Sequence, residues 1–269
     1  MLFARAIMIK IALIFGLCLS LYGQNPFIQK LPFKEAILVY KVSGNQKGFE
    51  TLYVKDYGKQ RVLYKDLKNS FLSKKKKTNS YTIMTPRYTY FLDQNQSAKK
   101  VPNLKYLLYI RYKELPKNEQ KQVLKNLKLI SNLPITTKNF KISKNYDKIN
   151  NIPCDLLIQN GKKNCYAYDG ELLLSSKVKF LGFNKNKLLY NLYQTKVDPN
   201  LFRLDDLNIT FDKQKSVKLY ELSKTIINIL KHKLNQKTFL HTTKKTKEDI
   251  QEVIKDGVEG LEKLNSSGI

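Results

Sequence analysis

Residues 37–44 read ILVYKVSG, and residues 48–58 read GFETLYVKDYG. Both runs are rich in β-branched and aromatic residues, and both end at glycine, which is typical of strands closed by turns. Similar runs recur at short, even intervals up to about residue 211, and this spacing predicts an antiparallel meander. Apolar residues fall on both faces of these strands, with Leu52 and Val54 on one side and Phe49 and Tyr53 on the other. Such a sheet must be covered on both faces or must line a cavity.

Helices are expected in two places. The first interrupts the strands between Pro116 and Pro134, where Val123, Leu124, Leu127 and Ile130 form an apolar stripe. The second is a C-terminal helical extension over residues 213–269, in which apolar residues follow helical spacing on either side of a polar linker. We therefore expect a mainly β (α+β) domain over residues 24–212 and this extension after it.

The C-terminal extension has two interpretations. A helical hairpin packed on the sheet is favoured, and a partner-binding or membrane-surface helix is the alternative. Its last predicted helix carries six acidic residues, which disfavours an anionic membrane. Under the alternative, residues 213–269 would contact an envelope protein partner.

The first 23 residues resemble a targeting signal. They read MLFARAIMIKIALIFGLCLSLYG, with a positive start, an apolar run from Ile11 to Leu21 and a small residue, Gly23, at the end. Because the segment from Met8 is a complete signal by itself, either methionine can be the initiator. We predict cleavage after Gly23 and export to the periplasm, with an uncleaved inner-membrane anchor as the alternative.

Export changes how the cysteines are interpreted. Cys154 and Cys165 flank Asn160-Gly161, a strong hairpin-turn signal. With a two-residue turn, Cys154 faces Ala167, so a bond to Cys165 would need a shifted register or a longer loop. A disulfide is still predicted, because two neighbouring thiols in an oxidising compartment tend to pair; two half-buried free thiols are the alternative. No metal site is expected, since no histidine lies near this pair.

The formal net charge is +27, from 49 Lys plus Arg against 22 Asp plus Glu. Nucleic acid is not the expected partner, because 44 of these cations are Lys, only 5 are Arg, and they are scattered along the chain. Two interpretations stay open. One is compositional bias that favours solubility, and the other is peripheral contact with anionic envelope lipids.

The sequence lacks the common catalytic and cofactor-binding motifs. It holds no Gly-rich phosphate loop, no zinc-protease motif and no nucleophile elbow. Its two histidines, His232 and His241, lie in a lysine-rich region and are expected to be solvated. We predict no enzyme activity and no cofactor.

Several stretches resemble a periplasmic family of unknown function that shares the fold of the lipoprotein carriers LolA and LolB. The similar stretches are residues 40–44 and 48–58, Tyr88–Asp93, Ile152–Asp155 and Tyr168–Leu174. The resemblance covers about two thirds of the chain, from Phe33 to Asp212, and does not include the helical tail. It implies a curved antiparallel half-barrel wrapped around a helical plug, with an apolar cavity between them that receives acyl chains. Arg is scarce, so no single arginine can be nominated for the ligand-gating role known in LolA.

The expected function is therefore the binding or carriage of a hydrophobic or acylated ligand in the half-barrel, with a non-enzymatic envelope interaction protein as the alternative. Asp93-x-Asn95-x-Ser97 and Asp206-x-Asn208-x-Thr210 also resemble the extended bacterial N-glycosylation sequon, which predicts glycosylation at Asn95 and Asn208. The residues expected to line the cavity are Leu52, Val54, Ile83, Tyr90, Leu127, Ile130, Leu156, Phe180 and Tyr190.

Overall fold

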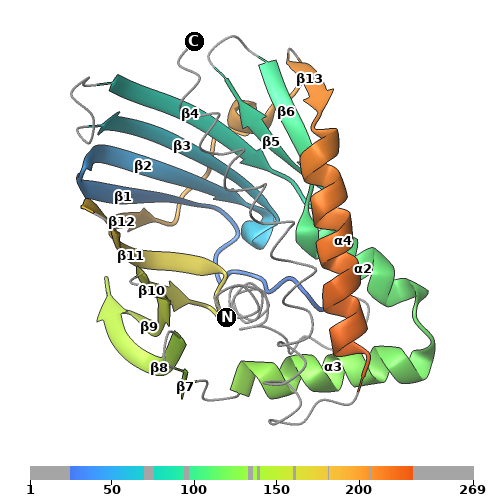
Figure 1. The fold of residues 1–269 in the computed structure, drawn as a ribbon. Helices are drawn as coiled ribbons and strands as arrows, with labels where there is room; N and C mark the ends of the chain where they lie inside the picture. The colour runs from blue at the N-terminus through green and yellow to red at the C-terminus, as the bar shows by residue number, and fades with distance from the viewer. Residues whose placement is uncertain are drawn as a thin grey trace.

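The structure is a computed structural model that describes residues 25–69, 76–93, 97–132, 136–137, 140–159, 162–180, 182–205 and 207–232. The predicted signal peptide, the second C-terminal helix and Asn95 lie outside these residues. One open sheet dominates the fold (Figure 1). Twelve strands pair antiparallel in succession, and a short thirteenth joins one edge in parallel. The sheet curves around the side on which the helices lie, and its two edge strands, β13 and β7, do not pair with each other.

The elements follow one another in three groups. The first group is β1 (Ala36–Gly44), β2 (Gln46–Lys55), β3 (Gln60–Asn69), β4 (Lys76–Met84), β5 (Tyr88–Leu92) and β6 (Ser97–Pro102). The second is α2 (Leu104–Glu114) and α3 (Lys117–Asn132). The third is β7 (Thr136–Thr137), β8 (Phe140–Ile149), β9 (Ile152–Gln159), β10 (Lys162–Ala167), β11 (Leu172–Phe180), β12 (Phe183–Tyr193), β13 (Asn208–Phe211) and α4 (Lys213–Leu230). The spatial order is β13-β6-β5-β4-β3-β2-β1-β12-β11-β10-β9-β8-β7.

The β1–β2 turn depends on two glycines. Gly44 has φ +103° and Gly48 has φ +142°, conformations that side chains rarely adopt. A Cβ at Gly44 would collide with the carbonyl of Asn184, and one at Gly48 with the carbonyl of Asp66. These glycines therefore let the β1–β2 hairpin lie close to β12 on one side and to β3 on the other.

The predicted fold class is confirmed: the chain is mainly β, with an open, curved antiparallel sheet and helices against it. The sequence analysis expected no helix before Pro116 and so missed α2. The helix expected between Pro116 and Pro134 is α3.

The sheet has two differently covered faces over β1–β5. The inner face carries Leu38, Leu52 and Leu63, which are directly paired across β1, β2 and β3. The outer face carries Val62, Ile83 and Tyr90, paired across β3, β4 and β5. The segment 197–205 covers this outer face with Leu201, Phe202 and Leu204. Segment 197–205, which follows β12 and is called the 197–205 strap below, thus covers part of the outer face.

The described part of the predicted C-terminal extension belongs to the core. In α4, Ile226, Ile227 and Leu230 are buried in one cluster with Leu108 of α2 and Leu127 of α3. Asn126 of α3 ties the end of this helix down, because its amide donates to the carbonyls of residues 230 and 232, both at 2.7 Å. The first helix of the tail is therefore packed against α2 and α3, while the expected helical hairpin stays a prediction.

Candidate ligand-binding face

One row of paired side chains crosses the inner face from β1 to β5. The row runs from Leu38 through Leu52 and Leu63 to Thr82 and Phe91. Leu38 is fully buried, Leu63 and Thr82 are partly exposed, and Phe91 is 39% exposed. The exposure of these side chains therefore increases from β1 to β5. The side chains at the β5 end still expose apolar surface that a ligand could cover.

The next row on the same face is charged. Tyr40, Glu50 and Lys65 pair directly across β1, β2 and β3. Glu50 is 2% exposed and accepts from Lys187 Nζ at 2.6 Å and Lys185 Nζ at 3.2 Å. Because side chains two residues apart in a strand share a face, this charged row lies about 7 Å from the apolar one.

The electrostatics of this row are dominated by burial and by crowded cations. Burial would raise the pKa of Glu50, but Lys187, Lys185 and Lys65 together hold it below its ordinary value. Burial lowers the pKa of Lys187, Glu50 opposes that shift, and the two neighbouring lysines add to it. The ammonium of Lys187 also lies 4.1 Å from the ring centre of Tyr40. Tyr40 donates to the carbonyl of Leu173 at 2.9 Å, and burial raises the pKa of its hydroxyl.

A second buried carboxylate, Glu171, lies in the turn between β10 and β11. Arg61 of β3 donates to the carboxylate at 2.7 Å and to the Glu171 carbonyl at 2.8 Å. Lys105 of α2 pairs with its other oxygen, which also accepts from the backbone of Gln29 at 3.3 Å. Burial would raise the pKa of Glu171, and the charges of Lys105 and Arg61 outweigh it, so the net shift is downward. The cluster joins the N-terminal segment, β3, α2 and the β10–β11 turn.

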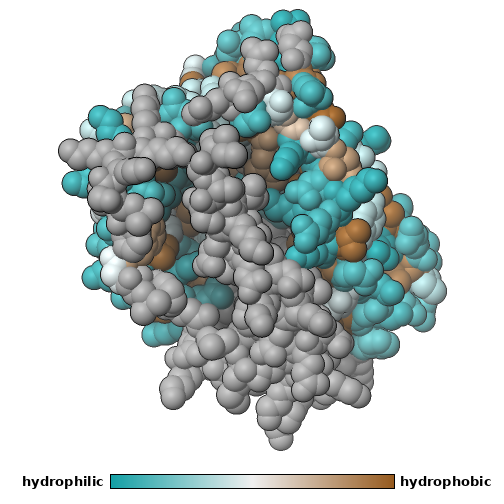
Figure 2. All heavy atoms as spheres, turned by 45° about the horizontal axis from the view of Figure 1, so that its top comes forward, coloured by the Kyte–Doolittle hydropathy of each residue, from teal (hydrophilic) through white to brown (hydrophobic). Residues whose placement is uncertain are grey.

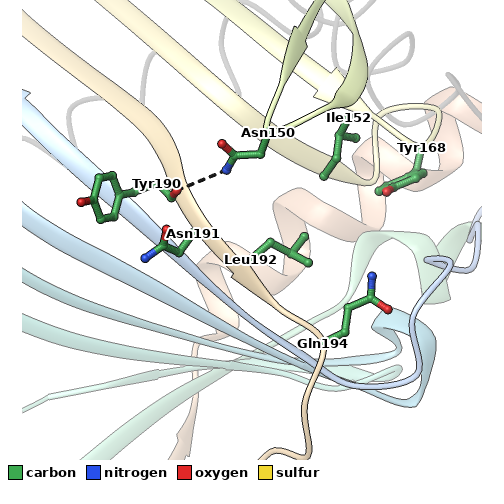
Figure 3. Close-up of a pocket in the computed structure, with 7 residues that line it drawn as sticks. All are labelled: Asn150, Ile152, Tyr168, Tyr190, Asn191, Leu192 and Gln194. Carbon is green, nitrogen blue, oxygen red and sulfur yellow. Dashed lines mark hydrogen bonds between the residues drawn. The ribbon is translucent and has the colours of Figure 1, made fainter.

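A separate cavity of about 360 Å³ opens where β11 leaves β12. The pairing of these strands ends at Ser175 and Leu188, and the residues of β12 beyond that point form one wall. The opposite wall comes from the β8–β9 and β10–β11 turns, and Asn150 reaches the carbonyl of Tyr190 at 3.3 Å (Figure 3). Its lining is made of amides, tyrosines and two aliphatic side chains: Asn150, Ile152, Tyr168, Tyr190, Asn191, Leu192 and Gln194.

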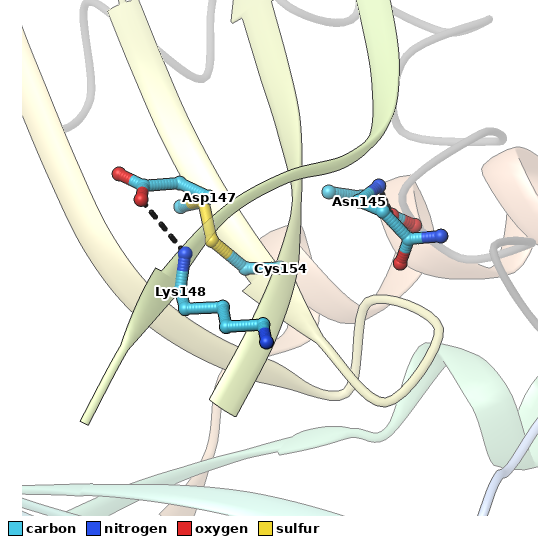
Figure 4. Close-up of a disulfide and its surroundings, with 6 residues drawn as sticks. Asn145, Asp147, Lys148 and Cys154 are labelled. Atoms are coloured by element: carbon cyan, nitrogen blue, oxygen red, sulfur yellow. Dashed lines mark hydrogen bonds between the residues drawn. A yellow bond between two sulfur atoms is a disulfide. The ribbon is translucent and has the colours of Figure 1, made fainter. Parts of the chain in front are cut away.

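The predicted disulfide between Cys154 and Cys165 is present (Figure 4). The hairpin register is the one derived from the sequence, because Cys165 is opposite Leu156 and not opposite Cys154. The expectation that a bond needs a shifted register was wrong, since the cysteines are diagonal neighbours with Cα atoms 5.5 Å apart. A bulge between Cys165 and Tyr166, in the pairing with β11, lies beside the bond.

The residues expected to line a cavity lie in different surroundings. Leu52 and Val54 are buried on the inner face, and Ile83 and Tyr90 are buried on the outer face under the 197–205 strap. Leu127 lies in the helical core, Leu156 is buried in β9, and Tyr190 is 57% exposed at the mouth of the 360 Å³ cavity. The side chains of Ile130 and Phe180 lie outside the described part of the structure. Of these residues, Leu52 lies in the apolar row and Val54 lies next to it on β2.

The site residues that the sequence analysis missed are the charged ones, Glu50, Glu171 and Lys65. The sequence did indicate Glu50. Residues 50, 52 and 54 alternate along one strand, so Glu50 is expected on the same buried face as Leu52 and Val54, where an acid needs a partner. Glu171 had no such signal, since its partner Arg61 lies 110 residues away in the sequence.

Figure 2 shows a mostly hydrophilic face with separate hydrophobic areas. Within the described ranges, no helix is long and apolar enough to cross a membrane, and no group of three or more His, Cys, Asp or Glu side chains could hold a metal ion. Asn208 is exposed on the edge strand β13, while Asn95 lies outside the described residues. Glycosylation at both positions remains a prediction.

No protein-family model matches the chain, and no curated protein sequence matches it either. Among solved structures, an uncharacterized conserved protein from Thermus thermophilus is similar over 67% of this chain and 91% of its own, at 7% identity and a TM-score of 0.37. LprF from Mycobacterium bovis is similar over 62% and 88%, at 9% identity and a TM-score of 0.26. PNGF-II is similar over 70% of this chain but only 33% of its own, at 11% identity and a TM-score of 0.35. At such low scores, the fold and function of this chain rest on its own residues.

Proposed function

We propose that this protein binds or carries a hydrophobic ligand with an acyl chain on the inner face of its open sheet, in the periplasm and without catalysing a reaction. The observation that carries the proposal is the apolar row on the inner face, whose exposure increases from Leu38 to Phe91. Burying this exposed end against an alkyl chain contributes about 0.8 kcal/mol per CH₂ group. The resemblance to the lipoprotein-carrier fold and the signal-like first 23 residues support the same function.

In this proposal the ligand enters where the apolar row reaches β5. Helix α4 lies across from β5, where the ammonium of Lys215 is 4.4 Å from the ring centre of Phe91. This contact is between an exposed lysine and an exposed ring, so it is weak and can be displaced by a ligand. An acyl chain placed here would lie between the sheet and α4.

The test compares two exposed phenylalanines on opposite faces. Phe91 is 39% exposed on the inner face, and Phe49 is 48% exposed on the outer face of β2. The full chain is titrated with monododecanoylglycerol, a neutral acyl probe, by calorimetry. Phe91→Asp is expected to weaken binding about tenfold, because a charge replaces the apolar contact, whereas Phe49→Asp leaves it unchanged.

The same protein, purified from a periplasmic fraction without detergent, is expected to carry acyl lipid in native mass spectrometry. Binding of the probe that is lost equally in both phenylalanine variants, or not detected at all, would refute the proposal. A mature N terminus that still begins at Met1 or Met8 would overturn the predicted cleavage.

A further inference from the structure

The inner face carries more positive than negative charge at one place. Around Glu50 lie three ammonium groups, those of Lys65, Lys185 and Lys187. Within the part of the chain that the structure describes, Lys65 has no ion-pair partner of its own. One carboxylate thus stands against three cations, which leaves a local charge of +2.

This excess positive charge lies where the side chains are partly buried, and burying a charge is unfavourable. Lys187 has only 13% of its side chain exposed and Lys185 has 23%, so water screens them incompletely. Burial lowers the pKa of Lys187, and repulsion from Lys65 and Lys185 adds to that lowering against the opposing effect of Glu50. A second anion placed against Lys65 and Lys185 would remove this repulsion.

The surplus also lies directly beside the apolar row. Lys65 is two residues from Leu63 on the same face of β3, and Glu50 is two residues from Leu52 on β2. A ligand whose alkyl chain lies along Leu63, Thr82 and Phe91 therefore has Lys65 beside the β3 end of that chain. Apolar and cationic rows in this order match a molecule with an alkyl chain and an acidic head.

We propose that the ligand is an anionic amphiphile, whose carboxylate or phosphate head binds Lys65 and Lys185 while its alkyl chain lies along Leu63, Thr82 and Phe91. This inference rests on the proposed function and specifies its ligand class. Charge-assisted hydrogen bonds from lysine to a carboxylate or phosphate are about twice as strong as neutral ones, which gives the head a preference over an uncharged head. A neighbouring contact supports the same chemistry: Lys185 and Lys187 already converge on an oxyanion, the carboxylate of Glu50, at 3.2 and 2.6 Å.

The experiment measures the affinity of the full chain for dodecyl phosphate, monododecanoylglycerol and inorganic phosphate by calorimetry at neutral pH, below micelle-forming concentrations. Dodecyl phosphate is expected to bind about tenfold more tightly than the neutral glyceride, as one charge-assisted contact predicts. Lys65→Gln is expected to abolish that preference, because it weakens the binding of dodecyl phosphate more than that of the glyceride. Lys65→Arg, which keeps the charge, is expected to retain it.

Lys68→Gln is the matched control, because Lys68 is also on β3 but is exposed on the other face. It loses the same charge and is expected to leave the preference for the anionic probe intact. Loss of preference in both glutamine variants would mean that overall charge, and not this site, attracts the anion.

The remaining outcomes separate this inference from the proposed function. Equal affinity for both acyl probes overturns the anionic head and leaves acyl binding standing. Inorganic phosphate that binds as tightly as dodecyl phosphate shows a bare anion site and refutes the amphiphile. No binding of either acyl probe refutes the proposed function itself.

Discussion

Glu50 and Glu171 are both buried glutamates that pair with cations from the inner side of the sheet, yet their surroundings differ. The partners of Glu171 come from β3, α2 and the N-terminal segment, and two cations and a backbone amide share its oxygens. Two lysines of β12, the strand beyond β1, pair with the carboxylate of Glu50, and Lys65 of the neighbouring strand β3 lies directly opposite it. The first carboxylate is enclosed by partners and joins distant elements. Around the second carboxylate, the lysines outnumber the acid, so another anion can bind there.

The largest effect is therefore expected at Glu171. Removing one member of a buried ion pair leaves charges without a counter-charge, which typically costs about 3–5 kcal/mol. Because Arg61 and Lys105 are 18% and 25% exposed, we expect Glu171→Gln to lose about 3 kcal/mol, near the lower end. Urea unfolding of the full chain, followed by circular dichroism, measures the loss.

The control for this change is Asp56→Asn. Asp56 pairs with Lys59 at 3.0 Å on the surface, where both side chains are nearly half exposed. Exposed pairs of this kind contribute less than about 1 kcal/mol, and asparagine accepts the positive φ of this position. If the two variants lost equal stability, Glu171 would not be the tie between distant elements that its contacts indicate.

This contrast also shows what the sequence can predict and what it cannot. The strand runs and the turn glycines specify the sheet, and the hairpin register around Asn160-Gly161 follows from local turn chemistry. The face of each strand does not follow, because it depends on how many residues the intervening loops contain. Leu52 and Ile83 look alike in the sequence but lie on opposite faces. Helix α2 was missed because its segment, LKYLLYIRYKE, is apolar on several sides and shows no single stripe.

A smaller effect on stability is expected at Glu50. Without its carboxylate, Lys187 can release its proton, since its pKa is already lowered, so Glu50→Gln is expected to cost about 2 kcal/mol. The same change should raise the affinity for dodecyl phosphate about threefold, because it removes the carboxylate that competes for the lysines. Dodecyl phosphate should therefore raise the melting temperature of Glu50→Gln more than that of the wild-type chain, and it should not rescue Glu171→Gln. Rescue of both variants to the same extent would remove the distinction between the two sites.

The smallest difference is expected in acid. The pKa of each carboxyl group, Glu50 and Glu171, lies below its ordinary value of 4.5 in the folded chain. A lowered pKa in the folded state stabilises the fold at pH values above the unfolded pKa, and this stabilisation is lost as the pH falls through the folded pKa. Wild-type stability should therefore decrease below about pH 4.5, and the curve for Glu171→Gln should be flatter and should approach the wild-type curve there. Urea midpoints measured between pH 7 and pH 3 test this, and parallel curves for the two proteins would mean that the Glu171 carboxylate is not the group whose protonation weakens the fold.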